Sequence, residues 1–358
     1  MKSQPQRVQW VDVVKYICIM WVMLSHLEAN TELLGTFYNP IFLNGFSFVS
    51  GYVYFRKDRF NKFFLKKVKG LFIPWLIFSV LNIVLAQIIT FAKHASLSEE
   101  LKWNFLQIRG RGDGIWYVAA LFVAFIPFYF FIEWYEKSEK YKKDRIIFIL
   151  IALFGSLMSS LYSKYMKPNI LPWGTASLPW HIEYIFIAMF WMFLGYMFRA
   201  KYEKKFDLVV KPIDALVVFV IYIVIRYLPF ICDYEIKNDI LSIFYSYVSE
   251  LIGVFILIFV SKKIPVNKYL LYIGQNTLIC FALHGKIYSM IQAVLKRTMG
   301  LTYTNVLANT LCSSVFAIIF TIVLSFILIG PIYVINRCLP FLIGRRYERR
   351  EGYVREQK

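Results

Sequence analysis

The chain has 358 residues, 59% of them hydrophobic, and a mean hydropathy of +0.55. A soluble protein of this length would be far more polar, so these values exclude an ordinary water-soluble domain. The formal net charge is +19. The Lys and Arg residues fall in short clusters between apolar runs, which is typical of membrane-protein loops, and we expect no nucleic-acid partner.

Apolar runs long enough to cross a bilayer recur along the whole chain. A transmembrane helix needs about 20 mainly apolar residues. The sequence predicts an all-α, polytopic transmembrane bundle that forms one domain over residues 1–358, with the bilayer as its surroundings. Its ten predicted spans are approximately 8–27, 38–55, 71–92, 115–132, 146–163, 181–198, 212–231, 240–260, 269–292 and 306–336. The second run is short and rich in Gly and Ser, so it could instead be a re-entrant or broken element.

The distribution of Lys and Arg predicts the orientation of these spans. If the N-terminus lies inside, the inner loops carry most of the positive charge, and ten spans return the C-terminus to the same side. The positive-inside rule therefore predicts that both termini are cytoplasmic. We expect the basic segments 56–69 and 345–350 to contact anionic lipid of the inner leaflet. No cleavage site follows the first run, which we interpret as a retained span.

The first run carries three ionisable residues, Asp12, Lys15 and His26. Such side chains are costly inside a bilayer and usually functional. At about 100° per residue, all three project from one helical face, and Lys15 and His26 lie about 16 Å apart along the axis. We expect this face to point into the bundle, with Lys15 in the inner half and His26 near the outer surface. The alternative is an ion pair between Asp12 and Lys15 near the interface, with His26 capping the helix.

The ninth run is amphipathic. It contains Gln275 and Asn276, and His284 shares a face with Thr277. These polar groups could line a site, or they could form the hydrogen bonds between helices that are common in bundles. The pattern leaves both interpretations open.

Several segments, in order, resemble the membrane acyltransferase 3 family, which includes bacterial sugar and polysaccharide O-acetyltransferases. A basic residue and a His separated by ten residues open the family's pattern, matched here by Lys15 and His26. Four later segments are similar to further family motifs and extend the resemblance to about residue 290: 48–52, 63–78, 114–121 and 271–284. The family often has Arg where this chain has Lys15, Lys67 and Lys69. Lys keeps the charge but loses the bidentate fork of Arg.

The resemblance implies a membrane O-acyltransferase that moves an acyl group, usually acetyl, from cytosolic acyl-CoA to a hydroxyl of a cell-surface or lipid-linked glycan, in a bacterial cytoplasmic membrane. His26 would be the base or a transient acyl carrier, Lys15 would bind phosphate and Asp12 would hold Lys15. Lys67 and Lys69 would bind the acetyl-CoA. The residues expected to contact the acceptor are Ser50, Trp116, Asn276 and His284.

No metal is expected, because the five cysteines lie in or beside apolar runs with no paired spacing. One alternative function is export of a polysaccharide or lipid-linked sugar without acyl transfer, although no internal repeat of the transporter kind is visible. Another is a non-catalytic scaffold in a cell-surface assembly, which would leave the polar face of the first run unexplained.

Overall fold

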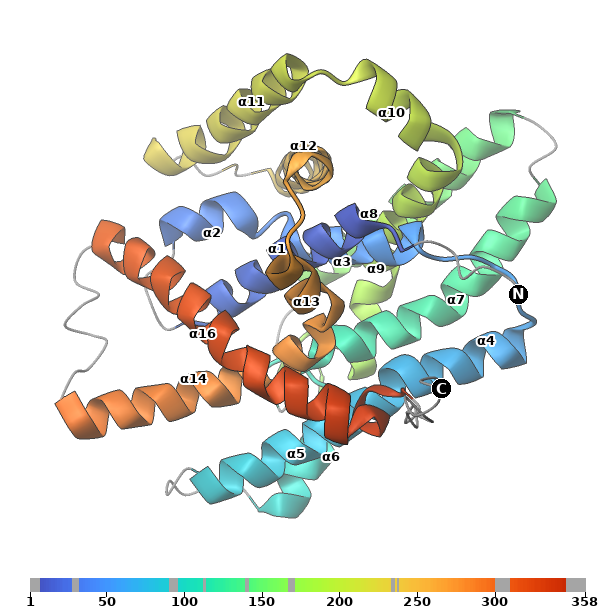
Figure 1. Cartoon of the computed structure of the whole chain (residues 1–358). Coiled ribbons are helices and arrows are strands. Elements are labelled where there is room, and N and C mark those ends of the chain that lie inside the picture. Colours follow the sequence, from blue (N-terminus) through green and yellow to red (C-terminus); the bar gives the residue numbers. More distant parts are fainter. Residues whose placement is uncertain are drawn as a thin grey trace, which may run out of the picture.

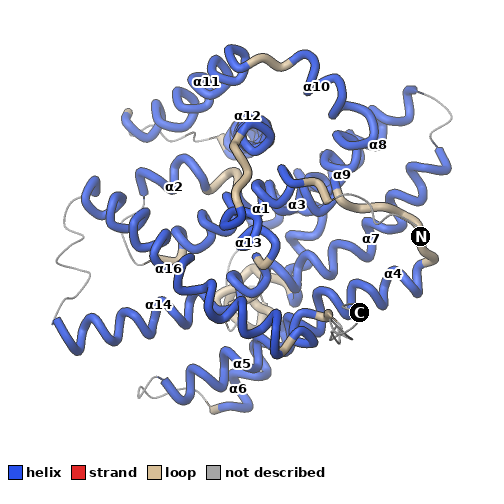
Figure 2. The backbone as a smooth tube through the Cα atoms, in the orientation of Figure 1, coloured by secondary structure: helices blue, strands red, loops and turns tan. Residues whose placement is uncertain are grey.

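The computed structural model describes residues 7–27, 32–89, 96–111, 114–138, 142–166, 171–232, 236, 238–299 and 310–345. Within these ranges helices are the only regular elements, apart from one isolated β-bridge (Figure 2). The helices are α1 Gln9–Ser25, α2 Glu32–Tyr38, α3 Phe42–Tyr52, α4 Phe60–Lys67, η1 Val68–Phe72, α5 Ile73–Ile89, α6 Leu97–Leu106, α7 Trp116–Ser138, α8 Lys142–Tyr165, η3 Pro179–Tyr184, α9 Ile185–Met197, η4 Phe198–Tyr202, α10 Glu203–Val209, α11 Pro212–Ile231, α12 Asp239–Lys263, α13 Lys268–Gln275, α14 Thr277–Met299, α16 Thr310–Cys338 and η5 Pro340–Ile343. This architecture follows from the bilayer, where each backbone N–H and C=O must be satisfied within its own segment.

Eight helices in the described ranges are long and apolar enough to cross a membrane. They are Phe60–Gln87, Trp116–Ser138, Asp144–Tyr165, Pro179–Val209, Pro212–Pro229, Asp239–Lys263, Thr277–Val294 and Cys312–Cys338. The predicted all-α polytopic bundle is thereby confirmed. The predicted span ends at 90–92 and 306–309, and the basic residues 346–350, lie outside the described residues.

The first two predicted spans are not among these eight helices. Helix α1 has 17 residues, which corresponds to about 26 Å of rise. Helix α3 has only 11 residues, or about 17 Å, and a helix of that length cannot cross a hydrocarbon core of about 30 Å.

Helices α7 and α9 run in the same direction and define the two ends of the bundle. Trp116 at the start of α7 lies beside Tyr184, directly before α9, with 5.4 Å between ring centroids. At the other end, the Tyr196 hydroxyl of α9 donates to Glu136 near the end of α7. Trp10 of α1 packs against Phe198, directly after α9. We call the end that contains Trp10 the Trp10 end, and the opposite end the His26 end.

The segment that contains α3 runs from the His26 end to the Trp10 end in spite of its short helix. Ser47 of α3 is hydrogen-bonded to Tyr117, in the first turn of α7. Four residues beyond α3, Arg56 donates to Glu136 at the other end of α7. The chain therefore combines a short helix with a non-helical stretch, in agreement with the alternative of a broken element.

Helix α1 lies in the middle of the bundle (Figure 1). It contacts α3, α12, α13, α14 and α16. Its buried apolar side chains include Val14, Cys18, Ile19 and Val22. The first predicted span is therefore enclosed by protein, as expected for a helix that carries ionisable side chains.

Helices α3 and α9 approach each other through two glycines. A Cβ atom on Gly51 would lie 1.8 Å from the carbonyl oxygen of Met192, and one on Gly195 would lie 1.9 Å from that of Phe48. Small residues of this kind allow backbones to pack closely in membranes, where the hydrophobic effect does not drive helices together.

A π-helical turn, η1, joins α4 to α5 without a break. Pro74 follows this turn after one intervening residue, Ile73. Proline lacks an N–H and its ring clashes with the carbonyl of the residue four positions earlier, so a wider turn before it relieves the clash. This turn carries Lys69.

We predict that Gly51→Ala and Gly195→Ala each destabilise the bundle, by about 3 kcal/mol, the upper end of the cost of overpacking. The measurement is thermal unfolding of the purified protein in detergent. Gly330→Ala is the matched control, because a Cβ on this helical glycine meets no atom within 4 Å. Equal melting temperatures for all three variants would contradict the close approach of α3 and α9.

Candidate functional site

Two histidines from helices far apart in sequence meet at the His26 end. His26 is the C-cap residue of α1, and its ring centroid lies 5.1 Å from that of His284 in α14. The His26 side chain is exposed, whereas His284 is buried. The structure thus brings one predicted catalytic residue beside one predicted acceptor-binding residue.

The local backbone fixes the tautomer of His284. Its Nδ1 atom lies 3.1 Å from the carbonyl oxygen of Cys280 and 3.0 Å from that of Phe281. Both carbonyl oxygens can only accept a hydrogen bond, so in neutral His284 Nδ1 carries the proton and donates it. The other ring nitrogen, Nε2, then keeps its lone pair.

Both histidines line a cavity of about 710 Å³. Its walls come from α5, α6, α14, the end of α1 and the segment before α7. Many lining side chains are polar or charged, among them Ser79, Asn82, Glu99, Glu100, Asn104, Arg111, Lys286 and Ser289. Trp103 adds an aromatic surface, over which the Arg111 guanidinium lies at 4.9 Å from the ring centroid. Such a cavity offers hydrogen bonds in several directions to a polyhydroxylated molecule.

The opposite end of α1 holds the other two polar residues of the first predicted span. Asp12 is 1% exposed. Its carboxylate accepts two hydrogen bonds from Arg7, with Nε at 2.6 Å and Nη2 at 3.0 Å. The Lys15 ammonium lies 3.6 Å from the same carboxylate, and Gln275 of α13 donates to it at 3.4 Å. The expected pair of Asp12 and Lys15 is present, joined by Arg7, which the sequence analysis did not single out.

A second cavity, of about 630 Å³, opens at this end of α1. Arg7, Asp12, Lys262 and Gln275 are among its lining residues. The two cavities have no lining residue in common. Helix α1 therefore connects a His-containing cavity at one end with a cation-rich cavity at the other.

The two lysines expected to bind the donor differ in their surroundings. The Lys67 ammonium lies over the ring of Phe125, 3.2 Å from its centroid, and 5.5 Å from that of Phe63. This cation–π arrangement is a stabilising contact in its own right. Lys69 is exposed on η1.

Three of the residues expected to contact the acceptor are not lining residues of the 710 Å³ cavity. Ser50 is half-buried in α3. Trp116 packs against His181, with 4.8 Å between ring centroids. Asn276 lies at the break between α13 and α14, where it donates to the Tyr272 carbonyl and accepts from Asn336. Of the four, only His284 lines this cavity.

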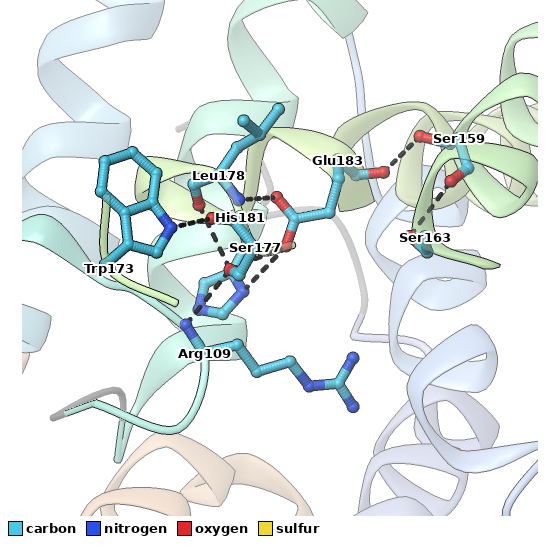
Figure 3. A network of polar contacts seen from close by, with 8 residues as sticks. All are labelled: Arg109, Ser159, Ser163, Trp173, Ser177, Leu178, His181 and Glu183. Atoms are coloured by element: carbon cyan, nitrogen blue, oxygen red, sulfur yellow. Dashed lines mark hydrogen bonds and ion pairs between the residues drawn. The ribbon is translucent and has the colours of Figure 1, made fainter. Parts of the chain in front are cut away.

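A polar network that the sequence analysis missed holds the segment before α9 (Figure 3). One Glu183 carboxylate oxygen accepts from the Ser177 hydroxyl at 3.0 Å, and the other from the Leu178 N–H at 2.9 Å. His181 Nδ1 lies 3.6 Å from the carboxylate. The Ser177 hydroxyl also accepts from the backbone N–H of Arg109. Glu183 thus connects this segment to the one that carries Arg111 of the cavity wall.

This network stabilises an unusual backbone. Trp180 and His181 have φ values of +59° and +51°, and such left-handed residues other than glycine cost about 1–3 kcal/mol each. The short motif His-x-Glu was the only signal in the sequence, and it is too common to have predicted the network.

The fold and the two polar regions define a multi-pass membrane protein with ionisable groups at both ends of an enclosed helix. Comparison with protein families gives a match to an acyltransferase domain over residues 8–330. The chain belongs to this family, the membrane acyltransferase 3 family, and is a membrane acyltransferase. No curated protein and no solved structure matches the chain.

We predict that Glu183→Ala loosens the network, because it leaves the Leu178 N–H and the Ser177 hydroxyl without their acceptor, at a cost of about 1–3 kcal/mol. Hydrogen–deuterium exchange should then rise over residues 177–184 and much less in α12. Glu183→Gln keeps one oxygen acceptor and should show a smaller rise. Unchanged exchange in Glu183→Ala would show that the carboxylate does not hold this segment.

Proposed function

We propose that this protein is an O-acetyltransferase that moves an acetyl group from cytosolic acetyl-CoA to a hydroxyl of a cell-surface or lipid-linked glycan, in a bacterial cytoplasmic membrane. The observation that carries the proposal is the position of His26. Its exposed ring opens on a polar cavity and lies 5.1 Å from that of His284. The cations Arg7 and Lys15, paired with the buried Asp12, lie at the opposite end of the same helix.

The reaction needs a base near neutral pKa, because a sugar hydroxyl is a poor nucleophile at pH 7. In the simplest sequence, an imidazole nitrogen of His26 takes the hydroxyl proton while the oxygen attacks the thioester carbonyl carbon. The new C–O bond forms, the C–S bond breaks, and His26 returns the proton to the leaving sulfur of CoA. In the alternative, His26 carries the acetyl group for one step before the hydroxyl attacks it.

His284 has a supporting part in this proposal. Its Nδ1 proton is held by the Cys280 and Phe281 carbonyls, so the Nε2 lone pair is available to accept a hydrogen bond. A proton acceptor of this kind behind His26 would orient the catalytic ring or bind the acceptor hydroxyl.

The donor enters, in this proposal, from the Trp10 end. The basic residues Arg56, Arg199 and Lys262 gather there, and positive charge favours the cytoplasmic side. Lys15 and Lys69 would attract the phosphates of CoA, and Asp12 would hold Lys15 in position. In this proposal, Lys67 binds the donor only after its ammonium has moved away from the Phe125 ring.

The acceptor would occupy the 710 Å³ cavity. Its lining combines carboxylates, amides and hydroxyls with the Trp103 ring, and this combination suits the hydroxyls and apolar faces of a sugar. Since the two cavities have no lining residue in common, passage of the thioester along α1 requires side chains between them to move.

We predict that His26→Ala lowers acetyl transfer at least about 100-fold, the lower end of the contribution of a general base. The assay compares surface glycans from cells that carry each variant, by mass analysis of the acetyl ester. Val294→Ala is the control variant, because it changes an exposed residue of α14 and should leave acetyl transfer at the wild-type level. Near-normal transfer by folded His26→Ala would exclude His26 as the base or carrier. An exporter would leave the ester unchanged and alter only the location of the glycan.

A further inference from the structure

A third cation joins Arg7 and Lys15 at the Trp10 end, and it comes from the opposite end of the sequence. Arg345 directly follows the turn after η5. Its Nη1 donates to the Asn336 side chain at 2.9 Å, and Asn336 in turn donates to Asn276 at 2.9 Å. This chain of hydrogen bonds holds the guanidinium near the break between α13 and α14, where Gln275 reaches Asp12.

The surroundings of Arg345 are electrostatically unfavourable for a cation. Arg345 is exposed, but partial desolvation by the surrounding protein lowers its pKa, and the positive charge of Arg7 lowers it further. Among the described residues, its side-chain hydrogen-bond acceptor is the neutral amide of Asn336. Arg7 and Lys15 already share the single carboxylate of Asp12. Arg345, whose charge interacts unfavourably with that of Arg7, therefore adds to an excess of positive charge near the start of α1.

A glycine fixes the position of Arg345. Gly344 has φ +70°, and a Cβ atom on it would lie 2.0 Å from the carbonyl oxygen of Lys69 in η1. Glycine therefore permits both the left-handed conformation and the close approach of the two backbones. The contact brings the turn after η5 against the π-helical turn η1, which carries Lys69. Segments near residues 7, 69 and 345 consequently meet at one end of the bundle.

We propose that Arg345, together with Arg7 and Lys15, binds a phosphate group of the acyl-CoA donor. This inference rests on the proposed function and adds to it a residue from the last described segment of the chain. Guanidinium groups suit phosphate because they donate two parallel, charge-assisted hydrogen bonds. A bound phosphate would also relieve the repulsion between Arg345 and Arg7. Helix α1 lies in the middle of the bundle (Figure 1), which favours a soluble donor over the headgroup of a surrounding lipid.

The test uses the full-length protein in nanodiscs of phosphatidylcholine and measures binding of CoA by calorimetry. Arg345→Gln should raise the Kd about tenfold, as expected for the loss of a charge-assisted contact, and Arg345→Lys should have a smaller effect. Arg337→Gln is the matched control, because Arg337 lies beside Asn336 in the last turn of α16 and its guanidinium contacts the exposed Tyr333. The Arg345→Gln protein should also raise KM for acetyl-CoA while it transfers acetyl from acetyl-pantetheine, which lacks the nucleotide phosphates, at the wild-type rate.

The outcomes separate this inference from the proposed function. If the wild type binds CoA and Arg345→Gln binds it equally well, the inference is wrong and the proposed function stands. An equal loss of transfer from acetyl-CoA and acetyl-pantetheine in Arg345→Gln would show a merely structural role and also overturn the inference. If the wild type binds no CoA, the proposed donor and the inference both fail. An effect of Arg345→Gln that appears only in nanodiscs of phosphatidylglycerol would assign the cluster to lipid and overturn it.

Discussion

The negative charge of Asp12 is the constraint around which the centre of this bundle is arranged. A buried carboxylate is tolerated only when it is paired and hydrogen-bonded, and Arg7, Lys15 and Gln275 together provide those contacts. Gly274 allows α13 to come close, since a Cβ there would lie 2.1 Å from the Asp12 carbonyl oxygen. The close contact of α13 encloses the start of α1, and α1 is consequently a central helix rather than one that faces lipid.

Helix α1 carries different functional groups at its two ends, and its length keeps them apart. Its Trp10 end gathers cations around one carboxylate, and its His26 end places an imidazole on a polar cavity. At 1.5 Å per residue, Lys15 and His26 are about 16 Å apart along the helix axis, which is roughly half of a hydrocarbon core about 30 Å thick. In the proposed reaction, this distance would separate donor recognition at one end of α1 from proton transfer at the other.

Much of the fold was predictable because apolar length and helical period are local properties of a sequence. Eight of the ten predicted spans correspond to helices of sufficient length. Hydropathy measures how much apolar chain is present but not how much of it is helical, so the 11-residue α3 and the non-helical stretch to Arg56 could not be distinguished from an ordinary span. In the site, the shared face of Asp12, Lys15 and His26 follows from the helical repeat alone. The expectation that Asn276 contacts the acceptor came from the family resemblance and stays a prediction; in the structure this side chain is hydrogen-bonded to Tyr272 and Asn336.

By itself, the sequence determined that this protein is a helical membrane protein with one unusually polar helix, and its motifs indicated the acyltransferase family. Only the tertiary structure decided which side chains meet that helix. The partner of His26 is His284, Asp12 is paired with Arg7 as well as Lys15, and Arg345 joins them from the last described segment. These contacts depend on which helical faces pack together, and on glycines such as Gly344 that let backbones touch. No local pattern encodes them, because each arises from the packing of segments that are distant in the chain.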